Sequence, residues 1–437
     1  MIFGVPIFLA VVAFISVVFV HELGHYFIGR CCGIGATTFS IGFGPKLFSF
    51  TDKRNTEWML CLIPLGGFVK FVTENDKSGS SVKMGRSGNL ESHNFSTSGS
   101  FESASLIYRT MTVLAGPVAN FFMSAIIFTF ISGMTGVMTT EPIVGDVADL
   151  PGKAITLMPG DRIITVEDTP VESFRQVYDL IATLDQMSDI RLSILRDGQV
   201  LELIIPHIFQ PIVFDVEMFS PAMKAGLKVG DVFLEADEQT ISSFEDLKFI
   251  IGSTNGKPIT LKIWRNDKII LTDLTPEMRP TETVDGNLIE QMRIGVRGGA
   301  LFSPAMVKPH LLESVWTGVR MTFYVIKTSL TGLARMIDQT ISPKHLSGPI
   351  GVAKALSYTA SEGFMPFFSL LAAISAGIGL VNLFPIPVLD GGHLMLFLYE
   401  GIFKKAPADR IIKFLMAAGL TMLLALMVFA TFNDILR

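Results

Sequence analysis

The sequence His21-Glu22-Leu23-Gly24-His25 stands at the end of an apolar run that extends from Ile2 to Val20. A run of this length approaches the ~20 residues that a helix needs to cross a bilayer. Two imidazoles and a carboxylate are costly there, because a charged group at the centre of a spanning helix costs roughly 2.5–3.5 kcal/mol. A bound metal ion would offset that cost. The stretch therefore predicts a membrane helix that carries part of a metal site.

The composition of the whole chain agrees with a membrane protein that also has soluble parts. Of its 437 residues, 49% are hydrophobic and only 17% are charged, and the mean hydropathy is +0.49. The net charge of −5 gives no reason to expect a nucleic-acid partner. The three cysteines, Cys31, Cys32 and Cys61, are too few and too irregularly spaced for a disulfide framework, so we expect free thiols.

Four segments are apolar enough to cross a bilayer, namely residues 2–27, 106–138, 364–384 and 411–432. The first lacks the basic start and the cleavage site of a signal peptide, so we interpret it as a retained span. A fifth segment, Leu311–Ile337, carries charges among apolar residues at helical spacing. It is typical of an amphipathic helix that lies at the membrane surface rather than crossing.

Basic residues predict the orientation of the chain. The segment between the first two spans is rich in lysine and arginine, and the short segment between the last two carries Lys404, Lys405 and Arg410. The positive-inside rule places both segments in the cytoplasm. With four spans, both termini and residues 139–361 then face outward.

The outward region contains an internal repeat. Pro159-Gly160-Asp161-Arg162-Ile163-Ile164 corresponds to Val229-Gly230-Asp231-Val232-Phe233-Leu234, and Phe174 corresponds to Phe244 at the same offset. Each copy is predicted to run strand, turn, strands, helix, strands, with late hairpin turns at residues 196–198 and 265–267. The copies resemble PDZ domains, through the segment Ser220–Asp231 above all. PDZ domains can add a peptide strand to a sheet edge, so peptide capture and passive spacing both remain open.

These patterns predict a polytopic α-helical membrane protein with four transmembrane helices and two β-rich PDZ domains between the second and third spans. A loop rich in serine, glycine and asparagine, residues 75–105, is predicted to be flexible. The expected organisation begins with a first membrane helix (1–30), a cytoplasmic or re-entrant β-hairpin region with that loop (31–105) and a second membrane helix (106–138). Two PDZ domains follow (139–208 and 209–280), and then a linker with the amphipathic helix (281–362). The chain ends with a third membrane helix (363–393) and a cytoplasmic loop with the last helix (394–437).

The spacing of the two histidines suits zinc chemistry. His21 and His25 lie four positions apart, so they share one face of a helix, and Glu22 projects nearby. Zinc can lower the pKa of a bound water to about 7, and Glu22 can take its proton and later protonate a leaving amine. A structural pair of histidines at a helix end is the alternative.

A catalytic zinc site usually has three protein ligands, so a third must come from elsewhere. Asp390 follows the segment Asn382–Leu389, in which Pro385 and Pro387 break the helix, and precedes two glycines. Broken backbone at membrane depth is tolerated only inside protein or beside water. Asp390 is therefore the preferred third ligand, with His393 as the competitor. If Leu311–Ile337 does not cross, the third span brings Asp390 to the depth of the two histidines.

The chain resembles the site-2 protease family of intramembrane metalloproteases. The resemblance rests on the His21–His25 motif, the Asn382–Gly391 segment and the PDZ-like repeats, and on further motifs at residues 39–44, 63–70, 115–120 and 346–350. It implies that His21, His25 and Asp390 bind zinc and that Glu22 is the general acid and base. Asn382 would hold the substrate backbone or the developing oxyanion, and a helix–helix hydrogen bond is its alternative. Pro385, Pro387, Gly66 and Gly67 are expected to contribute to substrate binding.

A substrate helix must unwind before its peptide bonds can be reached, because they are hydrogen-bonded internally. Leu60–Val72 is apolar with proline and glycine, and it could dip into the membrane as a β-hairpin that holds the substrate extended. An ordinary cytoplasmic hairpin is the alternative. Asn120, within Gly116–Asn120, is predicted to serve a contact between helices rather than the substrate.

The resemblance implies substrates that span the bilayer once, such as anti-sigma factors and signal-peptide remnants, cut after an earlier outer cleavage. It also implies the inner membrane of a bacterium, with the PDZ domains in the periplasm and the active site near the cytoplasmic side. The alternatives are a non-catalytic PDZ scaffold and a metal transporter. A transporter would need ionisable residues along several spans, and the second and fourth spans have few.

Overall fold

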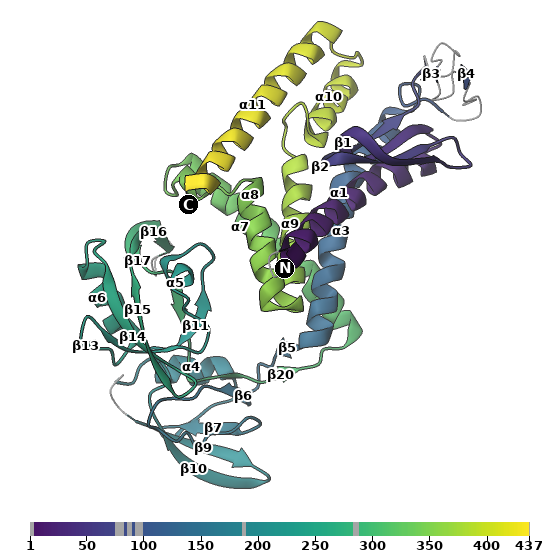
Figure 1. Cartoon of the computed structure of the whole chain (residues 1–437). Helices are drawn as coiled ribbons and strands as arrows, with labels where there is room; N and C mark the ends of the chain where they lie inside the picture. Colours follow the sequence, from purple (N-terminus) through teal and green to yellow (C-terminus); the bar gives the residue numbers. More distant parts are fainter. Residues whose placement is uncertain are drawn as a thin grey trace. The chain divides into compact units, whose positions relative to one another are not determined.

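The computed structural model describes residues 4–74, 83–84, 90–91, 99–185, 189–282 and 288–436. The chain divides into two compact units. The first comprises Met1–Gly133, His310–Ala334 and Pro343–Arg437, and the second comprises Met134–Pro309 and Arg335–Ser342. Most of the predicted flexible loop at 75–105 lies outside the described residues. The helices and strands of both units carry the labels of Figure 1.

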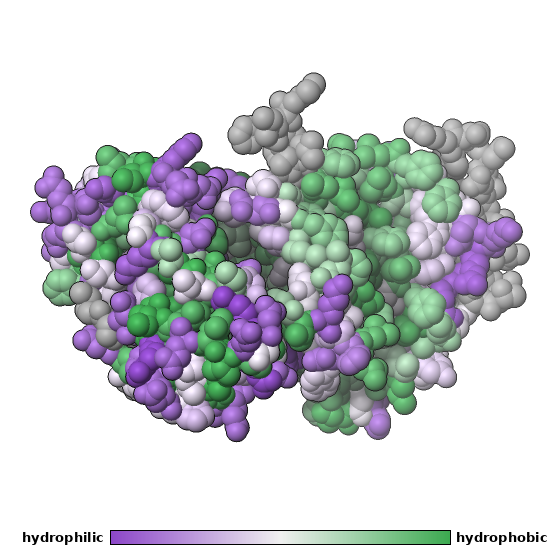
Figure 2. Space-filling view, turned by 90° about the horizontal axis from the view of Figure 1, so that it is seen from below, coloured by the Kyte–Doolittle hydropathy of each residue, from purple (hydrophilic) through white to green (hydrophobic). Residues whose placement is uncertain are grey.

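The first unit contains the predicted membrane helices. They are α1 (Gly4–Cys31), α3 (Leu106–Thr135), α9 (Phe364–Asn382) and α11 (Asp409–Leu436). All four are long and apolar enough to cross a membrane, as the sequence predicted. Figure 2 shows broad hydrophobic surface over the helical part of the molecule and a more mixed surface over the part built from strands.

Helix α7 (Leu311–Ile337) forms where the sequence predicted an amphipathic helix. It is not among the helices that are apolar enough to span, which agrees with the prediction that it does not cross. Its first half packs on α3: the hydroxyls of Thr322 and Ser124 lie 3.1 Å apart, and a Cβ on Gly318 would lie 2.4 Å from the carbonyl oxygen of Ala125. Packing against a membrane helix was not expected of a helix resting on the membrane surface.

Residues 343–362, predicted as part of a linker, instead form two helices separated by residues 346–348. A short 3-10 helix, η1 (Pro343–His345), precedes α8 (Pro349–Glu362). The carboxylate of Asp434, near the end of α11, accepts hydrogen bonds from the backbone N–H groups of Gly348 at 3.0 Å and Gly351 at 2.7 Å. It thereby caps α8, because the first N–H groups of a helix have no partner within the helix. Helix α10 (Asp390–Phe403) follows α9 after a short break.

A two-stranded antiparallel sheet covers part of α1 in the first unit. Strands β1 (Ala36–Thr51) and β2 (Glu57–Phe71) both curl, so that Phe39 of β1 is opposite Val69 and also opposite Trp58 of β2. Phe39 and Tyr26 of α1 are buried together beneath this sheet. The prediction that Leu60–Val72 forms its own hairpin is wrong, because the first part of β1 lies between the two ends of β2. A short pair, β3 (Lys83–Met84) and β4 (Leu90–Glu91), lies in the following region.

The second unit confirms the internal repeat, because its two copies have the same strand order. The first copy contains β7 (Arg162–Val166), β8 (Thr169–Pro170), α4 (Phe174–Ile181), β9 (Ile190–Arg196) and β10 (Gln199–Ile205), in the sheet order β10-β9-β7-β8. The second contains β12 (Val232–Ala236), β13 (Gln239–Thr240), α6 (Phe244–Ser253), β14 (Ile259–Arg265) and β15 (Lys268–Leu274). Read from the corresponding edge of the sheet, its order is β15-β14-β12-β13. Each copy has its own hydrophobic core.

A buried aspartate recurs in both copies and fixes the same turn. Asp161 binds Arg196 and Asp231 binds Arg265, in each case through two side-chain hydrogen bonds. Both aspartates are at most 2% exposed. Among the described residues, the helix α5 (Pro221–Lys224) occurs only in the second copy. The corresponding stretch of the first copy has a different sequence and forms no helix.

Strands after residue 276 return to earlier parts of the second unit, so this region is not a free linker as the sequence analysis expected. β16 (Glu277–Glu282) pairs with β17 (Leu288–Arg293). The remaining three strands pair with strands that precede each copy or follow α3: β18 (Val296–Gly298) with β11 (Val213–Val216), β19 (Phe302–Pro304) with β6 (Val144–Val147), and β20 (Met306–Val307) with β5 (Val137–Met138).

Candidate metal centre

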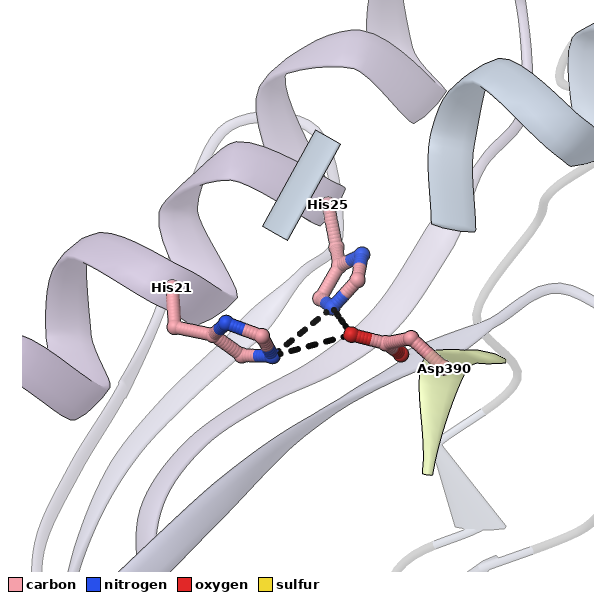
Figure 3. Close-up of side chains that lie close together, drawn as sticks. All are labelled: His21, His25 and Asp390. Carbon is pink, nitrogen blue, oxygen red and sulfur yellow. Dashed lines mark hydrogen bonds and ion pairs between the residues drawn. The ribbon is translucent and has the colours of Figure 1, made fainter. Parts of the chain in front are cut away.

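His21 and His25 lie on one face of α1, as their spacing predicts. Both are 8% exposed, so the two imidazoles are held within the first unit. Their Nε2 atoms lie 3.2 Å apart and point to the same place (Figure 3). The helix therefore presents two candidate nitrogen ligands to one point.

Asp390 reaches the same point from a distant part of the chain. Helix α9 ends at Asn382, and α10 begins at Asp390 after a non-helical stretch in which Pro385 and Pro387 provide no backbone donor. The Oδ2 atom of Asp390 lies 3.2 Å from Nε2 of His21 and 3.3 Å from Nε2 of His25. The predicted meeting of these three side chains is thus present in the structure, as Figure 3 shows.

The three ligand atoms fit a zinc ion. Four atoms at about 2.0–2.1 Å from zinc in tetrahedral directions lie about 3.3–3.4 Å from one another, and the observed separations are 3.2, 3.2 and 3.3 Å. Oδ2 of Asp390 is buried and accepts no hydrogen bond among the described residues. Converging lone pairs repel one another unless a cation lies between them. Three protein ligands also leave one position open, which is typical of a catalytic site rather than a structural one.

Helix α3 supports the ligands from behind. The carbonyl oxygen of Thr112 lies 2.9 Å from Nδ1 of His25, so it accepts a hydrogen bond from this nitrogen and leaves Nε2 free for the metal. Gly116 lies one turn further on, where an added Cβ would be 2.3 Å from Nε2 of His25. Only a glycine allows α3 to approach the imidazoles this closely.

Asn120, a further turn along α3, contacts the other histidine. Its Nδ2 atom lies 3.3 Å from Nδ1 of His21, and the residue is completely buried. The backbone carbonyl of Asn120 accepts a hydrogen bond from Ser375 of α9 at 2.9 Å. The three residues Thr112, Gly116 and Asn120 therefore place one face of α3 along the metal site.

Glu22 lies on α1 between the ligands and the sheet. It is 7% exposed, and a Cβ on Gly67 of β2 would lie 2.9 Å from its Cγ and 2.6 Å from the carbonyl oxygen of Ser40. Gly67 thus lets β2 lie directly against the side chain that the sequence predicted to be the general acid and base. Among the described residues, 67–71 pair only with β1, so this stretch of β2 has a strand partner on one of its two edges.

The other residues predicted to bind substrate or metal lie at the end of α9, in the break before α10, on α10 and in β2. Asn382 ends α9 and is half-buried, and its side chain makes no hydrogen bond to the three ligands. Pro385 is exposed and Pro387 is half-buried in the break before α10. Gly66 adopts a φ of +98°, which favours glycine. His393 lies on α10 and does not belong to the ligand group, which contains only His21, His25 and Asp390 among the described residues.

The contacts of Thr112 and Asn120 with the two histidines were not predicted from the sequence. A backbone carbonyl leaves no signal in a sequence, so the role of Thr112 could not be predicted. Gly116 and Asn120 did leave one: they lie four positions apart in an apolar span, and polar residues in such spans usually face the protein interior.

The comparison with known proteins agrees with this geometry. The model of peptidase family M50 matches residues 9–426. The chain belongs to peptidase family M50. A protein from Agrobacterium fabrum named as a zinc metalloprotease is 33% identical over 96% of this chain and 92% of its own length. The regulator of sigma-E protease RseP of Escherichia coli is 30% identical over 98% of this chain and 97% of its own length.

Membership of this family confirms the prediction of a zinc-dependent metalloprotease. Among solved structures, the PDZ domain of an SdrC-like protein from Listeria monocytogenes is 21% identical and has a TM-score of 0.17, covering 21% of this chain and 87% of the domain. A likeness at that TM-score does not establish the fold of the repeats.

Proposed function

We propose that this M50 peptidase is an endopeptidase that cuts single-span membrane proteins within the membrane, with His21, His25 and Asp390 as its zinc ligands. The observation that carries the proposal is the convergence of three side-chain atoms that come from two apolar segments of the chain. These atoms lie 3.2–3.3 Å from one another. Because α1 and α9 are long and apolar enough to cross a bilayer, a site built from α1 and the chain after α9 lies at membrane depth.

Zinc, when bound, supplies Lewis-acid activation of water for attack on a peptide bond. Glu22 accepts the proton of the attacking water and returns it to the leaving amine. Its burial against β2 excludes bulk water from the carboxylate. Asn382 is proposed to hold the substrate carbonyl, because its amide can both donate and accept a hydrogen bond.

The substrate is proposed to bind as an added strand along residues 67–71 of β2. This edge lies beside Glu22 through Gly67, and it pairs with β1 on its other side. A backbone held extended there has its peptide bonds free of the internal hydrogen bonds of a helix. Gly66 and Gly67 would admit the substrate backbone, and Pro385 and Pro387 would hold open the break that carries Asp390.

The orientation proposed for the chain follows from its basic segments. Residues 139–361, with the two PDZ-like repeats, face the periplasm of a bacterial inner membrane, and the metal site lies towards the cytoplasmic side. An even number of crossings between α1 and Asp390 is required, so the meeting of Asp390 with both histidines supports the proposal that α7 does not cross. The substrates would be anti-sigma factors and signal-peptide remnants whose outer part has already been removed.

The second repeat offers a place for a newly cut peptide end. A cavity of about 650 Å³ in the second unit is lined by Phe244 and Lys248 of α6 and by Val296 and Gly298 of β18, together with residues of the first repeat. β18 pairs with β11 along one edge among the described strands. A peptide strand added to its other edge would lie in this cavity.

Co-expression with a truncated single-span reporter tests the proposal. Wild-type chain should release the cytoplasmic part of the reporter, and Glu22→Gln should reduce the rate about 10²–10⁴-fold, because that is the usual contribution of a general acid and base. Zinc content should be unchanged, since Glu22 is not a ligand. Glu313→Gln, on the first turn of α7, is the matched control and should cleave normally. Cleavage by Glu22→Gln at the wild-type rate would refute the proposal.

A further inference from the structure

Asn120 has an unusual hydrogen-bond environment. Its side chain is completely buried, and its Oδ1 atom has no hydrogen-bond partner among the described residues. Its Nδ2 atom lies 3.3 Å from Nδ1 of His21. A buried polar atom without a partner costs about 1–3 kcal/mol. Either orientation of the amide leaves one of its two ends without a partner among the described residues, so the tautomer that His21 must adopt decides between them.

The two ends of a carboxamide have nearly the same shape, so a half-turn of the amide exchanges Oδ1 and Nδ2 without new contacts. With Nδ2 towards His21, the ring nitrogen Nδ1 must accept, and the proton of the neutral imidazole then resides on Nε2. That tautomer cannot bind a metal through Nε2. With Oδ1 towards His21, Nδ1–H donates to the oxygen and Nε2 keeps its lone pair.

We infer that Asn120 is a positioning residue that accepts a hydrogen bond from Nδ1–H of His21 and so holds this ligand in the tautomer that can bind zinc. The inference rests on the ligand set proposed above. It gives His21 the same kind of support that the carbonyl of Thr112 gives His25 at 2.9 Å. Metal-binding histidines usually donate their second ring N–H to an oxygen of the protein.

Packing between helices does not account for the Asn120 side chain. The hydrogen bond between α3 and α9 at this position uses the backbone carbonyl of Asn120, which accepts from Ser375. Ser124, four residues further along α3, makes the ordinary helix–helix contact, with its hydroxyl 3.1 Å from that of Thr322. Ser124 is also completely buried, so it is a matched control for the loss of a buried polar group on this helix.

The hydrogen bond can be read directly in zinc-loaded protein, because Asp390, 3.2 Å from Nε2 of His21, competes for a proton on that nitrogen when no metal is bound. Purified full-length chain in detergent, labelled with ¹⁵N-histidine and loaded with zinc, should show the Nδ1–H proton of His21 shifted downfield and slow to exchange with water, with His21→Ala identifying the signal. In Asn120→Leu this signal should move upfield and exchange faster, whereas Ser124→Ala should leave it unchanged. A wild-type Nδ1–H signal of His21 without the downfield shift of a hydrogen-bonded proton would overturn the inference without requiring any variant to fold.

Zinc affinity, measured by competition with a chelator, provides the second readout. Asn120→Leu should bind zinc about 10–100-fold more weakly, which is the usual loss on removing an outer partner of a ligand. Asn120→Asp, which keeps an oxygen acceptor, should stay within a few-fold of wild type, as should Ser124→Ala. Wild-type affinity in Asn120→Leu would overturn the inference. Retention of zinc by His21→Ala would instead refute the ligand set, so the two failures are distinguishable.

Discussion

Arg109 of α3 and Glu400 of α10 form a two-pronged ion pair, with separations of 2.7 and 3.1 Å between guanidinium nitrogens and carboxylate oxygens. The guanidinium also lies 5.2 Å from the centre of the Phe397 ring. Asp390 begins the helix that Glu400 anchors. Helix α3 therefore contacts both histidines through Thr112 and Asn120, and holds the helix of Asp390 through Arg109.

Arg109→Met should lower the thermal midpoint of the purified protein in detergent. The side chains of Arg109 and Glu400 are 16% and 27% exposed, so we expect a loss of about 1–3 kcal/mol, below the ~3–5 kcal/mol typical of a fully buried pair. Arg175→Met should change the midpoint little, because Arg175 and its partner Asp179 are 90% and 70% exposed. Equal effects of the two substitutions would contradict the support assigned to α3.

Gly116→Ala should abolish zinc binding and activity. The added Cβ would lie 2.3 Å from Nε2 of His25 and 2.9 Å from Cε1 of His21, so the imidazoles must move away from the metal position. Gly133→Ala lies on the same helix, and the nearest atom to its new Cβ would be 3.8 Å away. It should retain zinc and gain some helix stability. Metal analysis and the reporter assay measure both variants; normal zinc content in Gly116→Ala would show that the close approach is not required.

Asp231→Asn should unfold the second repeat selectively. Asp231 is 0% exposed, and its carboxylate receives two hydrogen bonds from Arg265. An amide cannot satisfy the guanidinium, so we expect a loss of about 3–5 kcal/mol. Limited proteolysis of the full chain should show new cuts between 211 and 274. Asp273→Asn, on the exposed part of β15, is the control; protection equal to wild type in Asp231→Asn would refute the assignment.

Asp52 should make the sheet sensitive to acid. Burial would raise the pKa of its carboxyl, but hydrogen bonds from Trp58, from the N–H groups of Thr56 and Arg54 and from Tyr26 hold that pKa below its ordinary value. A lowered pKa in the folded state adds stability above the ordinary pKa, and this stability is lost as the pH falls through the folded value. Between about pH 6 and about pH 3, the thermal midpoint of wild type should fall further than that of Asp52→Asn. Parallel curves would contradict the assignment.

The sequence predicted the parts of this fold that depend on local patterns. Apolar runs of sufficient length predicted α1, α3, α9 and α11, and a constant offset of Gly-Asp pairs predicted the repeat that shares one strand order. The late turns were also correct: Asp197 and Gly198 have positive φ angles of 51° and 80°, as a tight hairpin turn between β9 and β10 requires.

The parts that failed depend on pairing between distant segments. The two ends of β2 both pair with the same stretch of β1, which lies between them. The residue pattern within Leu60–Val72 does not show that its pairing partner is β1. Helix α8 was missed because its N-terminus is capped by Asp434, 83 residues from Gly351. Asn120 was predicted to be a helix contact because nothing in the sequence brings it to His21, which is 99 residues away.

The measurement that tests the central claim most directly is the zinc content of purified Asp390→Ala, compared with wild type and with Glu22→Gln. A site formed by two distant segments predicts one zinc ion per chain in wild type and in Glu22→Gln, and almost none in Asp390→Ala, since two imidazoles alone hold zinc weakly. Full zinc content in Asp390→Ala would contradict the account, because the metal would then be held without the carboxylate that lies 3.2 Å from His21.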